Sequence, residues 1–287
     1  MRSSQDRRSS WRAGLAIFLF LCALLCGCDL LRQSILANRS PRVPRPIPGL
    51  PSKHSHRVSQ FVFVTDFELR ADLPWFRELG QLREEILTEL QLPPPPAHAL
   101  IYVYLFEDRD QYERFMQARY PTLPRRRAFF VAQPRGISSS DDLLVYTFWG
   151  EHVRQDLRHE LTHALLHSIL KDVPLWLDEG LAEYFELPPE ARGLNRQHLL
   201  TIKREGLAPN LARLEQLHQV DQMSPAEYRE AWAWVHFMLR GNPKLRPILM
   251  NYLQQLRRTA APGSLHSLLK AEAPELEEDL LRYLSSL

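Results

Sequence analysis

The segment from about residue 152 to residue 170 constrains the fold most, because it combines a helical pattern of leucines with two histidines at helical spacing. His159 and His163 are four residues apart, so a helix places both imidazoles on one face, one turn apart, within reach of one metal ion. Glu160 follows the first histidine and projects beside such an ion, where it can take a proton from a water at the metal. A helix with two surface histidines is the simpler alternative, and a third ligand decides between the two.

A second helix is predicted directly after the first. Pro174, which is tolerated in the first turn of a helix, precedes a helical run that extends to Glu186. Glu179 and Glu183 are again four residues apart on this run. A tetrahedral catalytic zinc takes three protein ligands and a water, and a short connection packs two helices antiparallel, which can bring Glu179 to the two histidines. Glu183, one turn further on, could then hydrogen-bond a ligand histidine.

The HELTH and WLDEGLA sequences of these two helices resemble the paired motifs of the gluzincins, as found in one-zinc aminopeptidases and in smaller bacterial domains of the peptidase MA clan. The resemblance implies a zinc ion held by His159, His163 and Glu179, with Glu160 as the general base. The spacing between the two motifs is a few residues shorter than in the aminopeptidases, so we expect a tight loop. A Gly-Ala-Met-Glu-Asn-type segment, which would grip a free amino terminus, is not found in the sequence.

A tyrosine is the next candidate for the site. Hydrolysis of a peptide needs a group that stabilises the tetrahedral oxyanion, and in the aminopeptidases a tyrosine near the start of a later helix does this. Tyr228 occupies a similar place, three residues after Pro225. The resemblance therefore implies Tyr228 as a catalytic residue, and an ordinary tyrosine on a helix surface or in the core is the alternative.

Residues 1–27 have the pattern of a lipoprotein signal peptide. A basic stretch from Arg2 to Arg12 precedes an apolar run that reaches about Gly27, which is shorter than the roughly 20 residues that a membrane-spanning helix needs. The sequence LCGC, which ends at Cys28, resembles a bacterial lipobox, in which this cysteine is acylated and becomes the first residue. We therefore expect export and attachment to the cell membrane, on its periplasmic or extracellular face, through Cys28. A plain signal peptide or an uncleaved anchor is the alternative.

A proline-rich stretch follows the predicted lipidation site. Prolines recur from Pro41 to Pro51, a pattern that favours an extended polyproline II conformation and excludes a helix or a central strand. It predicts that residues 28–57 are a semi-rigid tether between the membrane and a folded domain that begins near residue 58.

The remainder of the chain predicts an α+β fold. Over residues 58–150, short β-branched and aromatic runs alternate with helical segments, and residues 151–287 are helical nearly throughout. This order predicts a mixed β-sheet with helices, followed by a mostly helical half that carries the active-site helix, in a zincin-like arrangement. In zincins the strand corresponding to Leu143–Phe148 is the sheet edge that pairs with an extended substrate, and an interior strand is the alternative here.

The net charge of the chain limits the kinds of partner that we expect it to bind. A net charge of +2 gives no reason to expect nucleic acid as a partner, and the Arg125–Arg127 run is typical of a solvated surface. We therefore expect a zinc-dependent peptidase that acts on a peptide or protein substrate and is held at a membrane by a lipid. The alternative is a catalytically inactive lipoprotein of the same fold that acts as a binding or scaffolding module.

Overall fold

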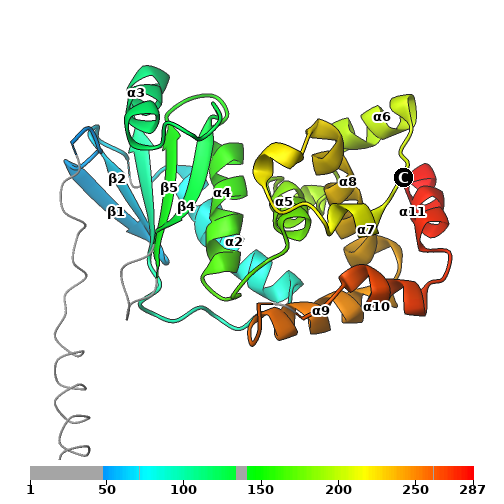
Figure 1. Ribbon diagram of the computed structural model, residues 1–287. Helices are drawn as coiled ribbons and strands as arrows, with labels where there is room; N and C mark the ends of the chain where they lie inside the picture. The colour runs from blue at the N-terminus through cyan, green and yellow to red at the C-terminus, as the bar shows by residue number, and fades with distance from the viewer. Residues whose placement is uncertain (1–47, 71, 134–140, 261) are drawn as a thin grey trace, which may run out of the picture. The chain divides into compact units, whose positions relative to one another are not determined.

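A computed structural model describes residues 48–70, 72–133, 141–260 and 262–287 (Figure 1). The predicted signal peptide, Cys28 and the tether as far as residue 47 lie outside the described residues. Within the described ranges, no helix combines the length and the apolar character needed to cross a membrane.

Five strands form one mixed sheet, in the spatial order β1-β2-β3-β5-β4. The strands β2, β3 and β5 run parallel to one another, and β1 and β4 are antiparallel to their neighbours at the two edges. Their bounds are β1 His54–Val58, β2 Phe61–Thr65, β3 Ile101–Phe106, β4 Ala128–Gln133 and β5 Asp142–Phe148.

The helices are concentrated in the second half of the chain, which confirms the predicted α+β class with a mostly helical C-terminal half. Within the sheet part they are α2 Pro74–Glu89 and α3 Arg109–Arg119. After the sheet they are α4 Val153–His167, α5 Leu175–Phe185, α6 Arg196–Glu205, α7 Leu211–Leu214, α8 Pro225–His236, α9 Leu245–Leu256, α10 Leu265–Glu272 and α11 Leu276–Ser286. Short 3-10 turns at Pro189–Ala191 and Val220–Gln222 and a π-helical turn at Phe237–Gly241 complete them.

The edge of the sheet beside the helical half is β4, and the prediction that Leu143–Phe148 forms this edge was wrong. That run is β5, which lies between β3 and β4. Its central residues are buried without alternation, as is typical of a strand paired on both sides and covered on both faces. Most residues of β4 are only partly buried, as expected for an outer strand.

The folded part begins before residue 58. Strand β1 starts at His54 and pairs in antiparallel register with β2, so the last residues of the predicted tether belong to the sheet. Three of its five residues are exposed, and the ring of His56 packs 4.8 Å from that of Phe76. A polar edge strand of this kind lacks the apolar pattern by which strands are found from sequence.

The two faces of the sheet carry different layers. On one face, Phe63 and Val103 pack into the same core as the apolar stripes of α2 and α4. On the other face, Phe106 and Tyr146 pack against Phe115 of α3. Successive side chains of a strand point to opposite faces, which is how one apolar strand such as β3 supports both layers. Helix α4 is thereby fixed against β4 and β5, with α5 on its other side (Figure 1).

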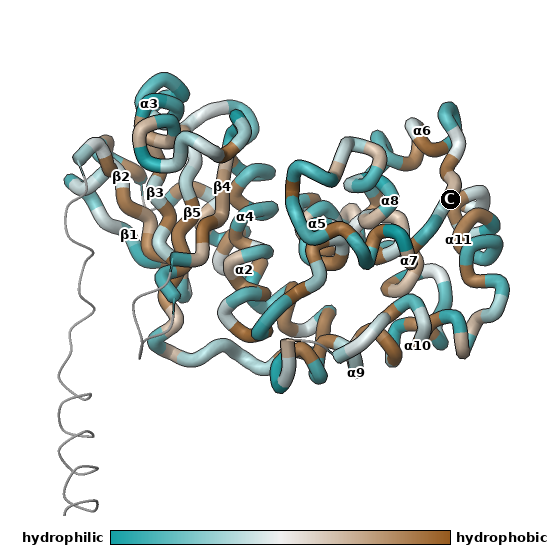
Figure 2. Tube along the Cα trace, in the orientation of Figure 1, coloured by the Kyte–Doolittle hydropathy of each residue, from teal (hydrophilic) through white to brown (hydrophobic). Residues whose placement is uncertain are grey.

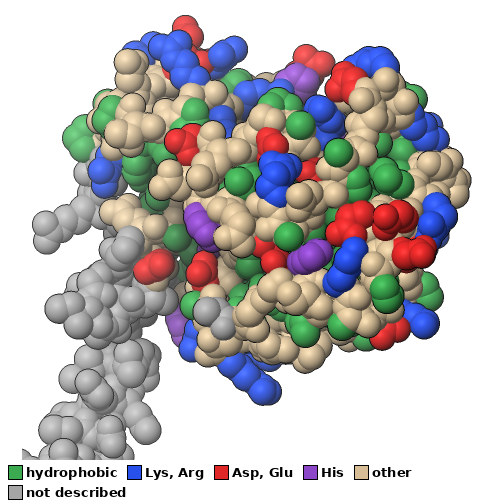
Figure 3. Space-filling view, turned by 45° about the vertical axis from the view of Figure 1, so that its right-hand side comes forward, with side chains coloured by type: hydrophobic (Ala, Val, Ile, Leu, Met, Phe, Trp, Pro, Cys, Tyr) green, Lys and Arg blue, Asp and Glu red, His purple; other side chains and the backbone are tan. Residues whose placement is uncertain are grey.

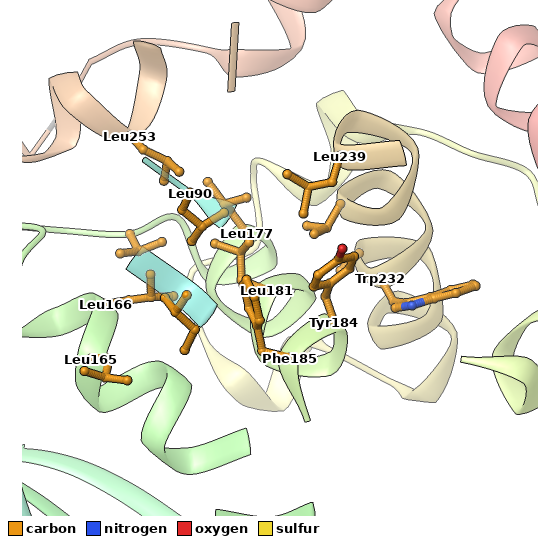
Figure 4. Packing of buried hydrophobic residues seen from close by; sticks show 14 of the residues in the cluster. Leu90, Leu165, Leu166, Leu177, Leu181, Tyr184, Phe185, Trp232, Leu239 and Leu253 are labelled. Atoms are coloured by element: carbon orange, nitrogen blue, oxygen red, sulfur yellow. The ribbon is translucent and has the colours of Figure 1, made fainter. Parts of the chain in front are cut away.

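The helical half is organised around α5. Figure 2 shows apolar residues concentrated on the inner strands and on α5, and Figure 3 shows acidic and basic side chains side by side over the outer surface of the helical part. In Figure 4, Leu177 and Leu181 of α5 lie among Leu166 of α4, Leu253 of α9 and Leu90. Because α5 is buried nearly all round, its polar residues are held in fixed positions between α4 and α8.

One buried histidine makes the stability of this part depend on pH. His236 is 3% exposed, and its Nδ1 lies 2.9 Å from the hydroxyl of Tyr283. Burial, helped by the nearby charge of Arg240, lowers the pKa of His236 to about 4. The folded state therefore favours the neutral ring, and stability that is complete above pH about 6.5 is lost as the pH falls toward 4.

We expect acidification from pH 7 to pH 4.5 to destabilise the wild type by about 2 kcal/mol more than His236→Gln, because the variant has no imidazole to protonate. Urea unfolding at the two pH values measures this difference. His218→Gln, which removes an exposed histidine, serves as the control and should follow the wild type. An equal loss of unfolding free energy in the wild type and in His236→Gln would contradict the lowered pKa of His236.

Candidate metal centre

Helices α4 and α5 bring three potential ligands together. The Nε2 atoms of His159 and His163, one turn apart on α4, each lie 3.5 Å from Oε2 of Glu179 on α5. Ligand atoms of these three residues all lie within 4.8 Å of one another. The short connection from α4 to α5, which Pro174 ends, allows the two helices to pack closely enough for this.

The geometry of the three residues fits a divalent metal ion. Oε2 of Glu179 is buried and has no hydrogen-bond partner in the described part of the chain. A buried carboxylate oxygen without a donor is costly, unless a cation satisfies it. Atoms bound at about 2.0–2.1 Å to a tetrahedral zinc are about 3.4 Å apart, close to the observed 3.5 Å between each histidine nitrogen and the carboxylate oxygen.

Two further carboxylates orient the histidines. Glu186 Oε2 lies 3.0 Å from Nδ1 of His159, and Asp178 Oδ2 lies 2.9 Å from Nδ1 of His163, although the latter contact lacks the angle of a hydrogen bond. Carboxylates that hold Nδ1 leave Nε2 free for a metal, which is the usual arrangement around metal-binding histidines. The amide of Gln155 donates to the other oxygen of Glu186, at 2.8 Å.

Glu183 does not make the hydrogen bond that the sequence predicts for it. Its Oε2 lies 2.8 Å from Nε2 of His198 on α6, and Glu186, the residue that caps the C-terminal end of α5, contacts His159 in its place. Both glutamates are on the same side of α5 as Glu179, so spacing alone does not distinguish them. Glu183, Glu186 and His159 form a second group with metal-ligand spacing, but each of these carboxylates already has a histidine partner.

The charges around His159, His163 and Glu179 favour the binding of a cation. Burial lowers the pKa of His163, but the charges of Asp178 and Glu179 outweigh it and raise that pKa to about 10. Burial raises the pKa of Glu179, yet its contacts with the two histidines hold that pKa well below the usual range. Both shifts favour positive charge next to Glu179, whether the histidine rings or a metal ion carry it. We therefore expect metal binding to release protons and to weaken as the pH falls.

Removing the charge of Asp178 tests the orienting contact. If the cluster binds zinc, we expect Asp178→Asn to weaken that binding by about 10–100-fold while the fold is kept, because the amide orients His163 less strongly and adds no negative charge. A competition titration with a chromophoric chelator measures the affinity. Asp172→Asn, on the exposed turn before α5, is the control. An unchanged affinity in Asp178→Asn would show that this carboxylate does not support the ligand.

Glu160 lies beside the three candidate ligands, on the side of the edge strand. Burial raises the pKa of Glu160, while the histidines and the backbone N–H of Phe130 in β4 oppose this shift. A carboxylate whose pKa is raised toward neutrality is a suitable proton acceptor and donor. Phe130 also stacks on His163, with ring centroids 6.4 Å apart, so β4 borders the site directly.

Tyr228 faces the same cluster from α8. Its hydroxyl donates a hydrogen bond to Oε1 of Glu179 at 3.3 Å and accepts one from Nη2 of Arg126 at 2.7 Å. The Arg125–Arg127 run predicts a solvated surface position for Arg126. Arg125 and Arg127 are indeed exposed, but Arg126 is half-buried, and a run of three arginines gives no sign that the middle one turns inward.

His167 continues the helical series of histidines without joining the ligands. Its Nε2 lies 3.0 Å from Oδ2 of Asp178, the same oxygen that approaches His163. His167 therefore contacts Asp178, the carboxylate that also approaches His163.

Comparison with known proteins gives no further identification: no protein-family model matches the sequence, and no curated protein does.

Proposed function

We propose that this chain is a zinc-dependent hydrolase of peptide bonds. The observation that carries the proposal is the unpartnered, buried Oε2 of Glu179, which lies 3.5 Å from Nε2 of both His159 and His163. Two imidazoles and one carboxylate suit zinc among the divalent metals, and three protein ligands leave a position open, as catalytic zinc sites require.

In this proposal the zinc is held by His159, His163 and Glu179. When bound, it would supply a Lewis acid that polarises the scissile carbonyl and lowers the pKa of the attacking water. Glu160 accepts the proton from that water and transfers it to the nitrogen of the leaving amine. Tyr228 gives up its hydrogen bond to Glu179 and donates its hydroxyl proton to the oxyanion that develops on the carbonyl oxygen.

Strand β4 is the proposed binding edge for the substrate. Among the described strands it pairs only with β5, so no strand lies along its outer side, where the backbone N–H of Phe130 interacts with Glu160. An extended peptide can add to such an edge through main-chain hydrogen bonds. Phe130 of β4 lies against His163, and a peptide on this edge would therefore run past the metal ligands.

A membrane location is proposed from the sequence alone. The apolar segment and the LCGC motif support acylation of Cys28, and the proline-rich stretch supports a tether between the lipid and the folded part. Metabolic labelling of the wild type and of Cys28→Ser with a radioactive fatty acid tests this. The wild type should incorporate the label and the variant should not, and an unlabelled wild type would refute acylation of Cys28.

A mixture of defined peptides tests the proposed activity. Full-length protein is incubated with the peptides, with a zinc chelator, and with chelator followed by added zinc, and the products are identified by mass spectrometry. We expect cleavage that the chelator abolishes and zinc restores. If zinc-loaded protein cleaves neither peptides nor unfolded proteins, the chain is a binding or scaffolding module and the proposal fails.

A further inference from the structure

The backbone at Arg126 is fixed just before the edge strand. The hydroxyl of Tyr112 donates to the carbonyl oxygen of Arg126 at 3.0 Å, and the hydroxyl of Thr147 donates to that of Arg127 at 3.1 Å. The segment between α3 and β4 passes beside the start of α4, where Arg127 ion-pairs with Asp156 (Figure 1). The side chain of Arg126 therefore starts from a rigid point, as a binding residue requires.

The side chain of Arg126 reaches the edge of the metal centre. Its guanidinium lies 5.7 Å from the ring centre of Tyr228 and donates to that hydroxyl at 2.7 Å. The hydroxyl of Tyr228 in turn contacts Glu179. Arg126 is thus hydrogen-bonded to Tyr228, which itself contacts the candidate ligand Glu179.

Most of the hydrogen-bonding capacity of Arg126 is unused. A guanidinium has five N–H donors. Within the described residues, its side chain donates only to Tyr228 and has no carboxylate at ion-pair distance, although its charge interacts with Glu179 and Glu160 from further away. Such a fork can bind both oxygens of a carboxylate at once.

A pocket of about 130 Å³ lies on the α3 side of the segment between α3 and β4, and Arg126 is among the residues that line it. Arg125, Arg126 and Phe129 of β4 line it, together with residues of α3. The one carboxylate in its described lining is that of Glu113, which already pairs with Arg109 at 2.6 Å. The pocket therefore presents basic groups, and its size suits one side chain or the end of a peptide.

We propose that Arg126 binds a carboxylate of the substrate next to the scissile bond, so that the enzyme prefers a substrate with an acidic group there. This inference rests on the proposed hydrolytic function. A peptide on the edge of β4 would direct one of its side chains, or its terminal carboxylate, into the pocket beside Phe129. A role for Arg126 in holding Tyr228 alone would instead affect all substrates equally.

Matched peptides test the selectivity. From a cleaved peptide we would make versions with Glu or Gln at the residue on each side of the scissile bond, and versions with a free or amidated C-terminus. We expect the wild type to show a kcat/KM at least about tenfold higher for the acidic member of one pair. The pair that shows it identifies a side-chain or a terminal carboxylate. Arg126→Gln should remove this preference, and Arg127→Gln, which removes the same charge one residue away, should keep it.

A second measurement does not need turnover. Succinic monohydroxamate carries a zinc-binding group and a carboxylate, and its terminal amide lacks only the charge. By calorimetry, zinc-loaded wild type should bind the acid at least about tenfold more tightly than the amide. The difference should vanish in Arg126→Gln and persist in Arg127→Gln.

The outcomes separate this inference from the proposed function. Equal affinities for the acid and the amide in the wild type, or an equal loss of kcat for acidic and neutral peptides in Arg126→Gln, would overturn the role of Arg126 in binding. The expected hydroxamate result without cleavage of any peptide would support the carboxylate site and overturn the peptidase proposal. A protein that binds no zinc would overturn both.

Discussion

Replacing Glu160 by glutamine is expected to lower peptide turnover by about 1,000-fold while the zinc content stays at the wild-type level. The amide has nearly the shape of the carboxylate, but it cannot accept a proton from the attacking water. Glu160 lies beside the three candidate ligands and contacts the backbone of Phe130. The variant should therefore lose proton transfer and keep the bound metal. Initial rates and metal analysis on the same preparation measure both quantities.

The matched control for this variant is Glu151→Gln, an exposed glutamate just before α4. It should cleave peptides at the wild-type rate. Full activity in Glu160→Gln would remove Glu160 from the mechanism. If Glu160→Gln lost both its zinc and its activity, Glu160 would be a metal ligand instead of the general base.

Replacing Gly180 by alanine is expected to destabilise the fold by about 3 kcal/mol and to weaken zinc binding. A Cβ atom at this position would lie 2.6 Å from the carbonyl oxygen of Ala231 and 2.9 Å from a methyl of Val235. Helices α5 and α8 therefore touch through their backbones here. They can accept the methyl group only by moving apart, which would move Tyr228 away from Glu179.

A loss of stability in Gly180→Ala would be informative, because alanine normally stabilises the interior of a helix by about 1 kcal/mol relative to glycine. Urea unfolding measures the change in the free energy of unfolding. Gly150→Ala is the control, since a Cβ there would meet only the ring of Phe148, at 3.5 Å. A Gly180→Ala variant as stable as the wild type would contradict the close packing of α5 on α8.

The elements that carry the candidate metal centre could be predicted because their signals are local. Helical spacing predicts that His159 and His163 share a face, and a connection of a few residues predicts that α5 returns along α4. The structure brings Glu179 to these histidines. The same local reasoning predicts the inner strands, whose apolar runs are continuous.

The features that sequence analysis missed depend on contacts between distant residues. The strands β4 and β5 pair and are close in sequence, but only the packing of the whole sheet decides that β4 is the outer strand. Glu183 and Glu186 are equally plausible partners for His159 until the position of α6 brings His198 to Glu183. Arg126 and Tyr228 are 102 residues apart in sequence, and no local pattern joins them.

The zinc content of full-length protein, measured by mass spectrometry beside that of Glu179→Ala, tests the central claim most directly. We predict one zinc per chain in the wild type and far less in the variant, with circular dichroism showing that both are folded. Equal zinc in the two proteins would remove Glu179 from the ligands, and a wild type without zinc would contradict the metal centre itself.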